Sequence, residues 1–196
     1  RASEISALLA DDGRGHATDG RGGQGSGGRG RAVRRGLAVV DAREGRAGFM
    51  GGHLAGSLYV PFDSSFPTVA GAYVDPEEEI VLVIDEADVE EAVRNLVRVG
   101  LDRIVGYVTP HALESWVDEG NEFERLDEIE ITELDEALDG DAATVIDVRT
   151  VAEYREGHVP GALNVDHTRL PDRLGELPGD RRLLVHCETG ARSAVA

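Results

Sequence analysis

The chain has 196 residues, of which 41% are hydrophobic, and a formal net charge of −18 from 38 acidic and 20 basic residues. This length accommodates one large or two small domains with a packed core. The acidic balance argues against nucleic acid and anionic membranes as partners, and no apolar run is long enough to span a bilayer.

A single cysteine excludes an intramolecular disulfide framework. A lone thiol fits a reducing compartment, so we expect a cytoplasmic protein. All basic residues are arginine, and an acidic, lysine-free surface is typical of halophilic proteins, although a GC-rich genome also favours arginine. The sequence begins at Arg1 without a methionine, which predicts a fragment or a processed product.

The N-terminal segment divides into two parts. Residues 2–10 have the apolar spacing of a short amphipathic helix. Residues 11–35 consist largely of glycine and arginine and cannot bury enough surface to order themselves, so we expect a disordered insertion there. RNA binding is disfavoured because this insertion has no aromatic residue for base stacking.

Strand and helix patterns then alternate, which predicts an α/β fold with a parallel sheet. Strands are expected at residues 37–41, 57–60, 80–85 and 103–108, and helices at 89–99 and 111–117. The pattern restarts with a short strand at 129–131 and a helix at 132–138 capped by Thr132. Further strands are expected at 144–148, 162–165 and 182–187.

The restart is an internal repeat. Residues 39–43 match 145–149, residues 52–57 match 157–162, and residues 4–9 match 133–138. On this register we expect one domain at 1–126, carrying the insertion at 11–35, and a second at 127–196.

The most informative stretch runs from Leu183 to Ser193. Its apolar start predicts a buried strand that ends at Cys187, and a short polar loop then leads to Arg192. The loop residues are Glu188, Thr189, Gly190 and Ala191. Backbone N–H groups of such a loop converge on one point and lower the pKa of a cysteine below its free value of about 8.5. The stretch therefore predicts a nucleophile that attacks or carries an anionic group.

Cysteine followed after four residues by arginine resembles the active-site loop of rhodanese-like sulfurtransferases, in which the cysteine carries a persulfide. Two other family motifs precede it in the family's order. They are an Asp-x-Arg strand end at Asp147 and Arg149, and a Gly-His-x-Pro-Gly-Ala loop around His158. The resemblance implies small parallel sheets flanked by helices. The alternative is a buried structural cysteine at a strand end.

The matching motifs in both repeats make the chain similar to a tandem rhodanese. The first repeat is expected to be catalytically silent, with Asp85 in the place of Cys187. The second repeat ends at Ala196, before the family's last strand, so we expect it to be truncated. The sequence leaves open whether this shortened copy folds and is active.

The silent and active pair, with the helix that carries Trp116, also resembles the C-terminal half of metallo-β-lactamase–rhodanese fusion proteins. That resemblance implies a metallo-hydrolase or persulfide dioxygenase domain as a partner. The six histidines of this chain are scattered through the sequence, so we predict no metal site and no cofactor in it.

The resemblance implies a catalytic Cys187 assisted by Arg192, with the anion held by N–H groups of residues 188–192. Glu188 and Thr189 are expected to influence substrate choice. Asp147 and Arg149 are expected to form a structural ion pair, with orientation of the loop or substrate as the alternative, and His158 to act as a hydrogen-bonding strut.

The expected reaction moves sulfur from a small anionic donor, thiosulfate or a persulfide, to cyanide or a thiol. One alternative is a non-enzymatic sulfur relay or docking module for a metallo-hydrolase. Another is a cysteine phosphatase or arsenate reductase, which the loop length disfavours because those families have one more residue between cysteine and arginine.

Overall fold

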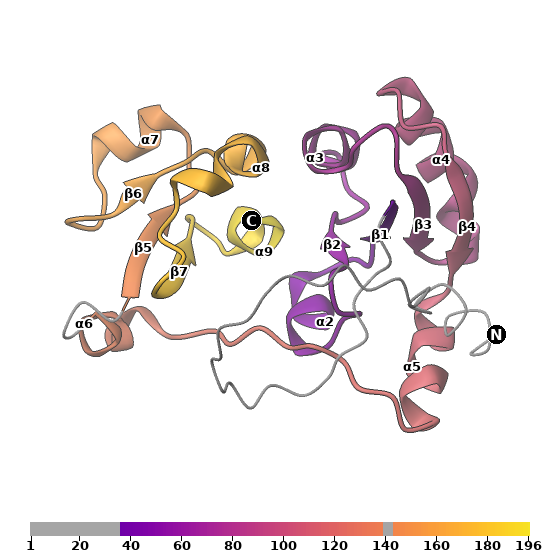
Figure 1. Ribbon diagram of the computed structural model, residues 1–196, viewed down its shortest axis with the longest axis horizontal. Coiled ribbons are helices and arrows are strands. Elements are labelled where there is room, and N and C mark those ends of the chain that lie inside the picture. The colour runs from indigo at the N-terminus through magenta and orange to yellow at the C-terminus, as the bar shows by residue number, and fades with distance from the viewer. Residues whose placement is uncertain (1–35, 139–142) are drawn as a thin grey trace, which may run out of the picture.

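The computed structural model describes residues 36–138 and 143–196. The predicted helix at residues 2–10 and the predicted insertion at 11–35 lie outside these ranges. The described chain forms two parallel sheets, each flanked by helices (Figure 1). This architecture agrees with the α/β class expected from the alternating strand and helix patterns.

The first sheet has four parallel strands in the order β2-β1-β3-β4. The strands are β1 (Leu37–Asp41), β2 (Leu58–Tyr59), β3 (Glu79–Val83) and β4 (Ile104–Val108). Every residue of β1 is buried. A strand covered on both faces needs a continuous apolar run rather than an alternating one, which explains the sequence Leu-Ala-Val-Val at residues 37–40.

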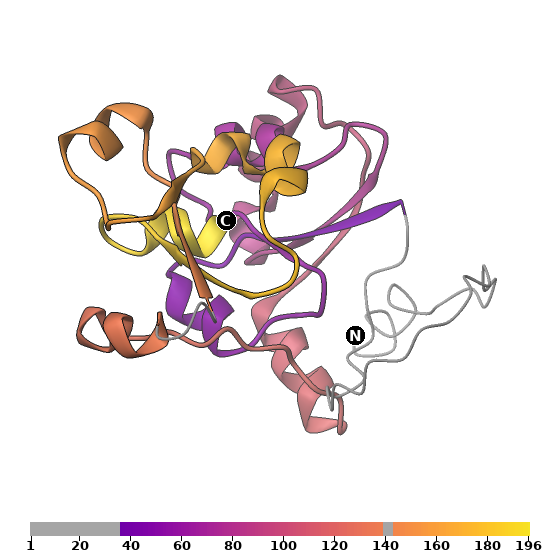
Figure 2. The same cartoon turned by 60° about the vertical axis from the view of Figure 1, so that its left-hand side comes forward.

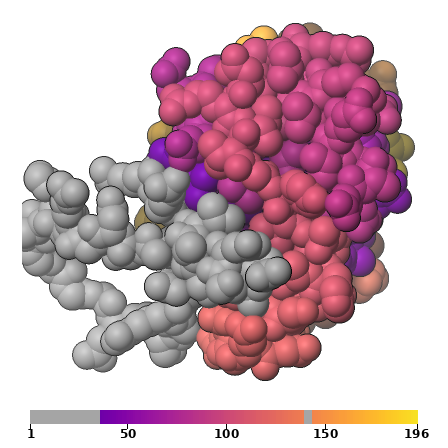
Figure 3. Space-filling view, turned by 90° about the vertical axis from the view of Figure 1, so that its right-hand side faces the viewer, coloured from indigo at the N-terminus to yellow at the C-terminus, as the bar shows by residue number. Residues whose placement is uncertain are grey.

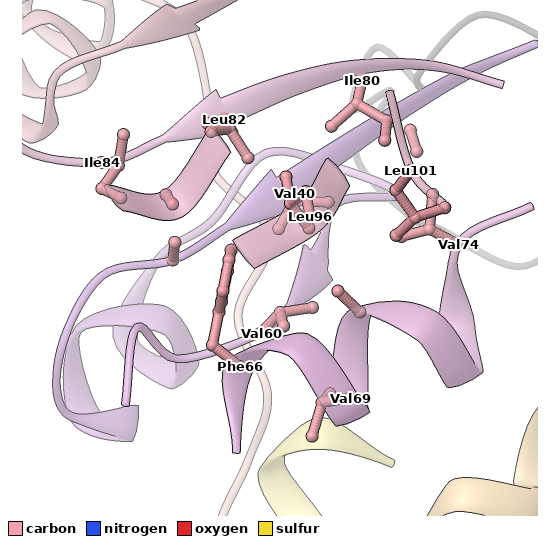
Figure 4. Packing of buried hydrophobic residues seen from close by; sticks show 14 residues of the cluster. Val40, Val60, Phe66, Val69, Val74, Ile80, Leu82, Ile84, Leu96 and Leu101 are labelled. Carbon is pink, nitrogen blue, oxygen red and sulfur yellow. The ribbon is translucent and has the colours of Figure 1, made fainter. Parts of the chain in front are cut away.

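Helices pack on both faces of this sheet. They are α2 (Arg46–Gly51), α3 (Phe66–Tyr73), α4 (Val89–Arg98), preceded by the 3-10 turn η1 (Glu86–Asp88), and α5 (Pro110–Asp118). Successive residues of β3 point to opposite faces: Leu82 packs with Phe66 and Leu96 (Figure 4), whereas Val83 packs with Trp116. In Figure 3 the pink surface is the outer face of the segment from α4 to α5. This segment belongs to the first half of the molecule, which is built around the first sheet; the second half is built around the second sheet.

The second sheet has three parallel strands in the order β6-β5-β7. The strands are β5 (Ala143–Asp147), β6 (Leu163–Asn164) and β7 (Arg182–His186). The helices of this half are α7 (Val151–Glu156), α8 (Leu170–Arg173), between the 3-10 turns η4 (His167–Arg169) and η5 (Leu174–Glu176), and α9 (Ala191–Val195). Within residues 36–138 and 143–196, β7 pairs with β5 alone, so its other edge is open. No helix of the described ranges has the length and apolar character to cross a membrane.

The segment between the sheets differs from its prediction. Residues 129–131 form no strand: Ile131 is 75% exposed and begins the 3-10 turn η2 (Ile131–Glu133), which leads into α6 (Leu134–Ala137). The predicted cap Thr132 lies inside this turn, and Glu130 and Glu133 form the capping box instead. The strand was predicted from Ile129 and Ile131, two apolar residues among acidic ones. No neighbouring strand of the described ranges pairs with them, so they do not form a buried strand.

The same polar contact closes one loop of each half. In the first half, Arg43 pairs with Asp41 at 2.7 Å and donates to the carbonyl oxygen of the glycine before the loop histidine at 2.9 Å. In the second half, Arg149 pairs with Asp147 at 2.7 Å and donates to the corresponding glycine carbonyl at 2.7 Å. The two matching sequence motifs therefore build the same local structure.

The halves meet around α9, which lies between β7 and the region of β2 and α2 (Figures 1 and 2). Ala194 of α9 is buried with Phe49 of α2 and Tyr59 of β2. A second bridge is the Tyr73 hydroxyl, which donates to the carbonyl oxygen of His167 at 2.8 Å. The loop before α9 is consequently positioned by both halves of the chain.

Candidate active site

Cys187 lies directly after β7, at the start of the loop that leads into α9. Gly190 sits in the left-handed region with φ 87° and turns the chain back toward the sulfur. The N–H of Gly190 donates to Cys187 Sγ at 3.2 Å, and the hydroxyl oxygen of Ser193 lies 3.6 Å from the same sulfur. The Gly190 N–H thus points at Sγ, while the Ser193 hydroxyl accepts from the thiol and donates to the carbonyl oxygen of Gly190 at 3.2 Å.

These contacts set the acidity of the thiol. Burial opposes ionisation of Cys187, but hydrogen bonds from the N–H and hydroxyl of Ser193 and from the N–H groups of Thr189 and Gly190 outweigh it. The pKa of Cys187 consequently lies below that of an ordinary cysteine thiol. The thiolate is the form that attacks sulfur or carbon electrophiles.

We expect Ser193→Ala to raise the pKa of Cys187, because it removes one donor to the thiolate and leaves the backbone donors in place. The fraction of thiolate, and with it the rate of alkylation by iodoacetamide, should fall near neutral pH. At a pH well above both pKa values the two proteins should react equally fast. A pH–rate profile of alkylation measures this shift, and identical profiles would contradict it.

Arg192 is not placed as its sequence position predicted. Its guanidinium donates to both carboxylate oxygens of Glu153 in α7, at 2.7 and 2.8 Å, rather than facing the loop as a free cation. These hydrogen bonds hold the pKa of Glu153 far below its usual range, with help from Thr150. The pair links α9 to α7, while the charge of Arg192 still interacts electrostatically with Cys187.

The loop residues divide into two groups. Thr189 and Gly190 line the cavity beside the sulfur, and both supply N–H groups to it. Glu188 and Ala191 are exposed and are not among the residues that line this cavity. Substrate contact is thus geometrically available to Thr189, whereas Glu188 points its charge toward solvent outside the cavity lining.

Asp147 and Arg149 form a buried structural unit at the end of β5. The carboxylate of Asp147 is fully buried and accepts from both the side chain and the N–H of Arg149. Burial would raise the pKa of Asp147, but these bonds and the neighbouring charge of His186 lower it. His158 is exposed, donates from Nδ1 to the carbonyl oxygen of Tyr154 at 2.8 Å, and stacks on that tyrosine with ring centroids 3.7 Å apart.

A cavity of about 700 Å³ adjoins Cys187 and the open edge of β7. Both halves and the segment that connects them contribute to its walls. Its lining includes Arg46 and Met50 of α2, Arg125 to Ile131 of the connecting segment, all of β7, and Ser193 and Ala194 of α9. Sequence reasoning missed Arg46, because nothing in the local pattern around it indicates a contact with a distant loop.

The first half holds no nucleophile at the corresponding position, but the residue there is not the one predicted. Val83 pairs with Asp41 in the first sheet, and His186 pairs with Asp147 in the second. By this register Ile84, not Asp85, corresponds to Cys187. Ile84 is 2% exposed and packs into the core (Figure 4), so an apolar side chain fills this position.

Among the described residues, no group of three or more His, Cys, Asp or Glu side chains is arranged to hold a metal ion.

Comparison with known proteins relates the second half to one family. Residues 130–196 match the family model of the rhodanese-like domain. The chain is 36% identical over 69 residues to a sulfurtransferase of Allochromatium vinosum, which covers 35% of this chain and 64% of that protein. It is 43% identical over 61 residues to the HTH-type transcriptional regulator Rv0324 of Mycobacterium tuberculosis, which covers 31% of this chain and 27% of that protein.

Among solved structures, the chain resembles SseA from Escherichia coli, described as a 3-mercaptopyruvate sulfotransferase. The two are 20% identical with a TM-score of 0.33, over 82% of this chain and 86% of that one. The chain spans less than two thirds of the length of each of the two curated relatives named above. The family model thus relates residues 130–196 to the rhodanese-like domain, and the curated relatives of the chain include a sulfurtransferase.

Proposed function

We propose that the chain is a sulfurtransferase that carries sulfur as a persulfide on Cys187. The observation that supports this most directly is the set of N–H and hydroxyl donors around Sγ, which stabilises an anion on that atom. A persulfide that extends from Sγ needs the same stabilisation. The cavity beside Cys187 offers space for a small donor and then for an acceptor.

The proposed reaction has two displacement steps. The Cys187 thiolate attacks the outer sulfur of thiosulfate, a new S–S bond forms, and the bond to the sulfonate sulfur breaks as sulfite leaves with its electron pair. The carbon of cyanide then attacks the outer sulfur of the persulfide, which releases thiocyanate and restores the thiolate. A persulfide donor and a thiol acceptor exchange sulfur in the same way, and no cofactor takes part.

The two sheets are proposed to be tandem copies of one unit, at residues 1–126 and 127–196. The shared strand order β2-β1-β3 and β6-β5-β7 supports this, as do the matching Asp–Arg contacts. His53 and His158 reinforce it, since each donates from Nδ1 to the carbonyl oxygen of the residue four positions earlier and stacks on that residue's ring. The first copy is proposed to be silent because Ile84 stands at the nucleophile position.

Two further expectations accompany the proposal. The cytoplasm is the proposed location, since a lone catalytic thiol needs reducing conditions. A metallo-β-lactamase-fold domain remains the predicted partner, and the gene sequence on both sides of residues 1–196 tests that expectation.

Incubation with thiosulfate is expected to add one sulfur atom per chain, detectable in the intact mass, and cyanide should then remove it as thiocyanate. Prior alkylation of Cys187 should prevent both events. Sulfur that loads but is never released to cyanide or thiols would favour the non-enzymatic relay. Hydrolysis of a phosphate ester without sulfur loading would instead favour the phosphatase alternative.

A further inference from the structure

Arg46 of the silent half lies against the active-site loop of the other half. A Cβ atom built on Gly190 would lie 2.8 Å from Nε and 2.9 Å from Cζ of Arg46. The guanidinium thus rests on the backbone of Gly190, the residue whose N–H donates to Cys187 Sγ. Arg46 and Cys187 also line the same cavity.

Five arginines lie in or near the site: Arg46, Arg125 and Arg182 line the cavity, and Arg149 and Arg192 lie in ion pairs beside it. Arg125 belongs to the exposed connecting segment. Arg192 donates both of its terminal nitrogens to Glu153, and Arg149 is held by Asp147. Arg182 lines the cavity from the first position of β7, about five residues of extended chain, or roughly 16 Å, from Cys187. Among the described arginines that line the cavity, Arg46 is the one shown in contact with the loop.

The ion pair that Arg46 forms with Glu128 is exposed to solvent, so its carboxylate can be exchanged for another anion. The Arg46 guanidinium pairs with Glu128 of the connecting segment, which also lines the cavity. Both side chains are solvent-accessible, with 37% and 51% of their surfaces exposed. An exposed ion pair of this kind contributes little to stability, so a bound anion can replace the carboxylate.

We propose that Arg46 binds the anionic end of the sulfur donor beside Cys187, and that Glu128 occupies Arg46 when the donor is absent. This inference rests on the proposed function and deepens it: the half without a nucleophile supplies the determinant for anionic donors. A guanidinium offers two parallel N–H donors, which match the oxygens of a sulfonate or carboxylate. In a chain of net charge −18, such a local cation offsets the general repulsion of an anion.

The test compares two alkylating reagents that react identically at Sγ, the anion iodoacetate and the neutral iodoacetamide. The ratio of their rates reports anion binding and cancels differences in thiol acidity. Arg46→Gln is expected to lower this ratio about fivefold, the effect of one close charge partly screened by water. Glu128→Gln is expected to raise the ratio, because it frees Arg46. The KM for thiosulfate should rise in Arg46→Gln.

Arg94→Gln is the matched control, since it removes the same charge from an exposed position on α4, where Arg94 pairs with Glu90. An unchanged ratio in Arg46→Gln, or an equal fall in Arg94→Gln, would overturn the proposal. An unchanged ratio in Glu128→Gln would refute the proposal that Glu128 and the donor compete for Arg46. If Arg46→Gln is too unstable to assay, the ratio measured for Glu128→Gln tests the proposal on its own. Alkylation by these reagents does not require sulfur transfer. If the rate ratio changes as expected in both variants but thiosulfate loads no sulfur on Cys187, only the proposed function is refuted.

Discussion

Cys187→Ser is expected to abolish sulfur loading while leaving the fold intact. A serine hydroxyl is a weak nucleophile unless a general base takes its proton. The groups that hydrogen-bond to the Cys187 sulfur in the described structure are N–H groups of the loop and the hydroxyl of Ser193, and none of these is a base. The rate of sulfur transfer should therefore fall by about three orders of magnitude or more.

Thiocyanate formation and the intact mass after thiosulfate treatment measure this loss. The folding control is thermal denaturation, because a serine oxygen can still accept from Gly190 and preserve the loop. Appreciable turnover by the serine variant with an unchanged melting curve would remove Cys187 from its proposed role. An equal loss in a conservative variant far from the site, such as Arg94→Gln, would point to a general effect of the assay.

Local patterns were sufficient to predict the strands that carry the chemistry. The buried runs of β1 and β5 and the loop after Cys187 all have sequence signals that act over a few residues. Helices α2, α3 and α7 were not predicted, in part because α2 and α3 contain glycines. Such residues weaken the helical pattern, and tertiary packing compensates for them.

The errors concern contacts between segments distant in sequence. The match between the repeats put Asp85 in the place of Cys187, whereas the pairing of β3 with β1 puts Ile84 there. A shift of one residue in a strand moves every side chain to the other face of the sheet. Arg192 was predicted to face the anion because its partner Glu153, 39 residues earlier, could not be identified from the loop alone. The approach of Arg46 to Gly190 depends on how the two halves pack.

Gly190→Ala is expected to slow alkylation of Cys187 by iodoacetamide about tenfold. The φ of 87° costs a residue with a Cβ roughly 1–2 kcal/mol, and relief of this strain moves the N–H that donates to Sγ. A change of about 1.4 kcal/mol corresponds to a factor of ten. The new methyl group would also displace the Arg46 guanidinium, whose flexible end it meets at 2.8 Å. The rate with iodoacetate should consequently fall further than the rate with iodoacetamide.

Gly161→Ala separates backbone strain from the effect on the site. Gly161 has a similar φ of 81°, but a Cβ there would meet no atom within 4 Å. Both variants should lower the melting temperature, since both place an alanine in the left-handed region. Only Gly190→Ala should slow Cys187 and reduce its preference for the anionic reagent. Equal alkylation rates in the two variants would show that the Gly190 backbone and its contact with Arg46 do not control the thiol, because strain alone would then account for the whole effect.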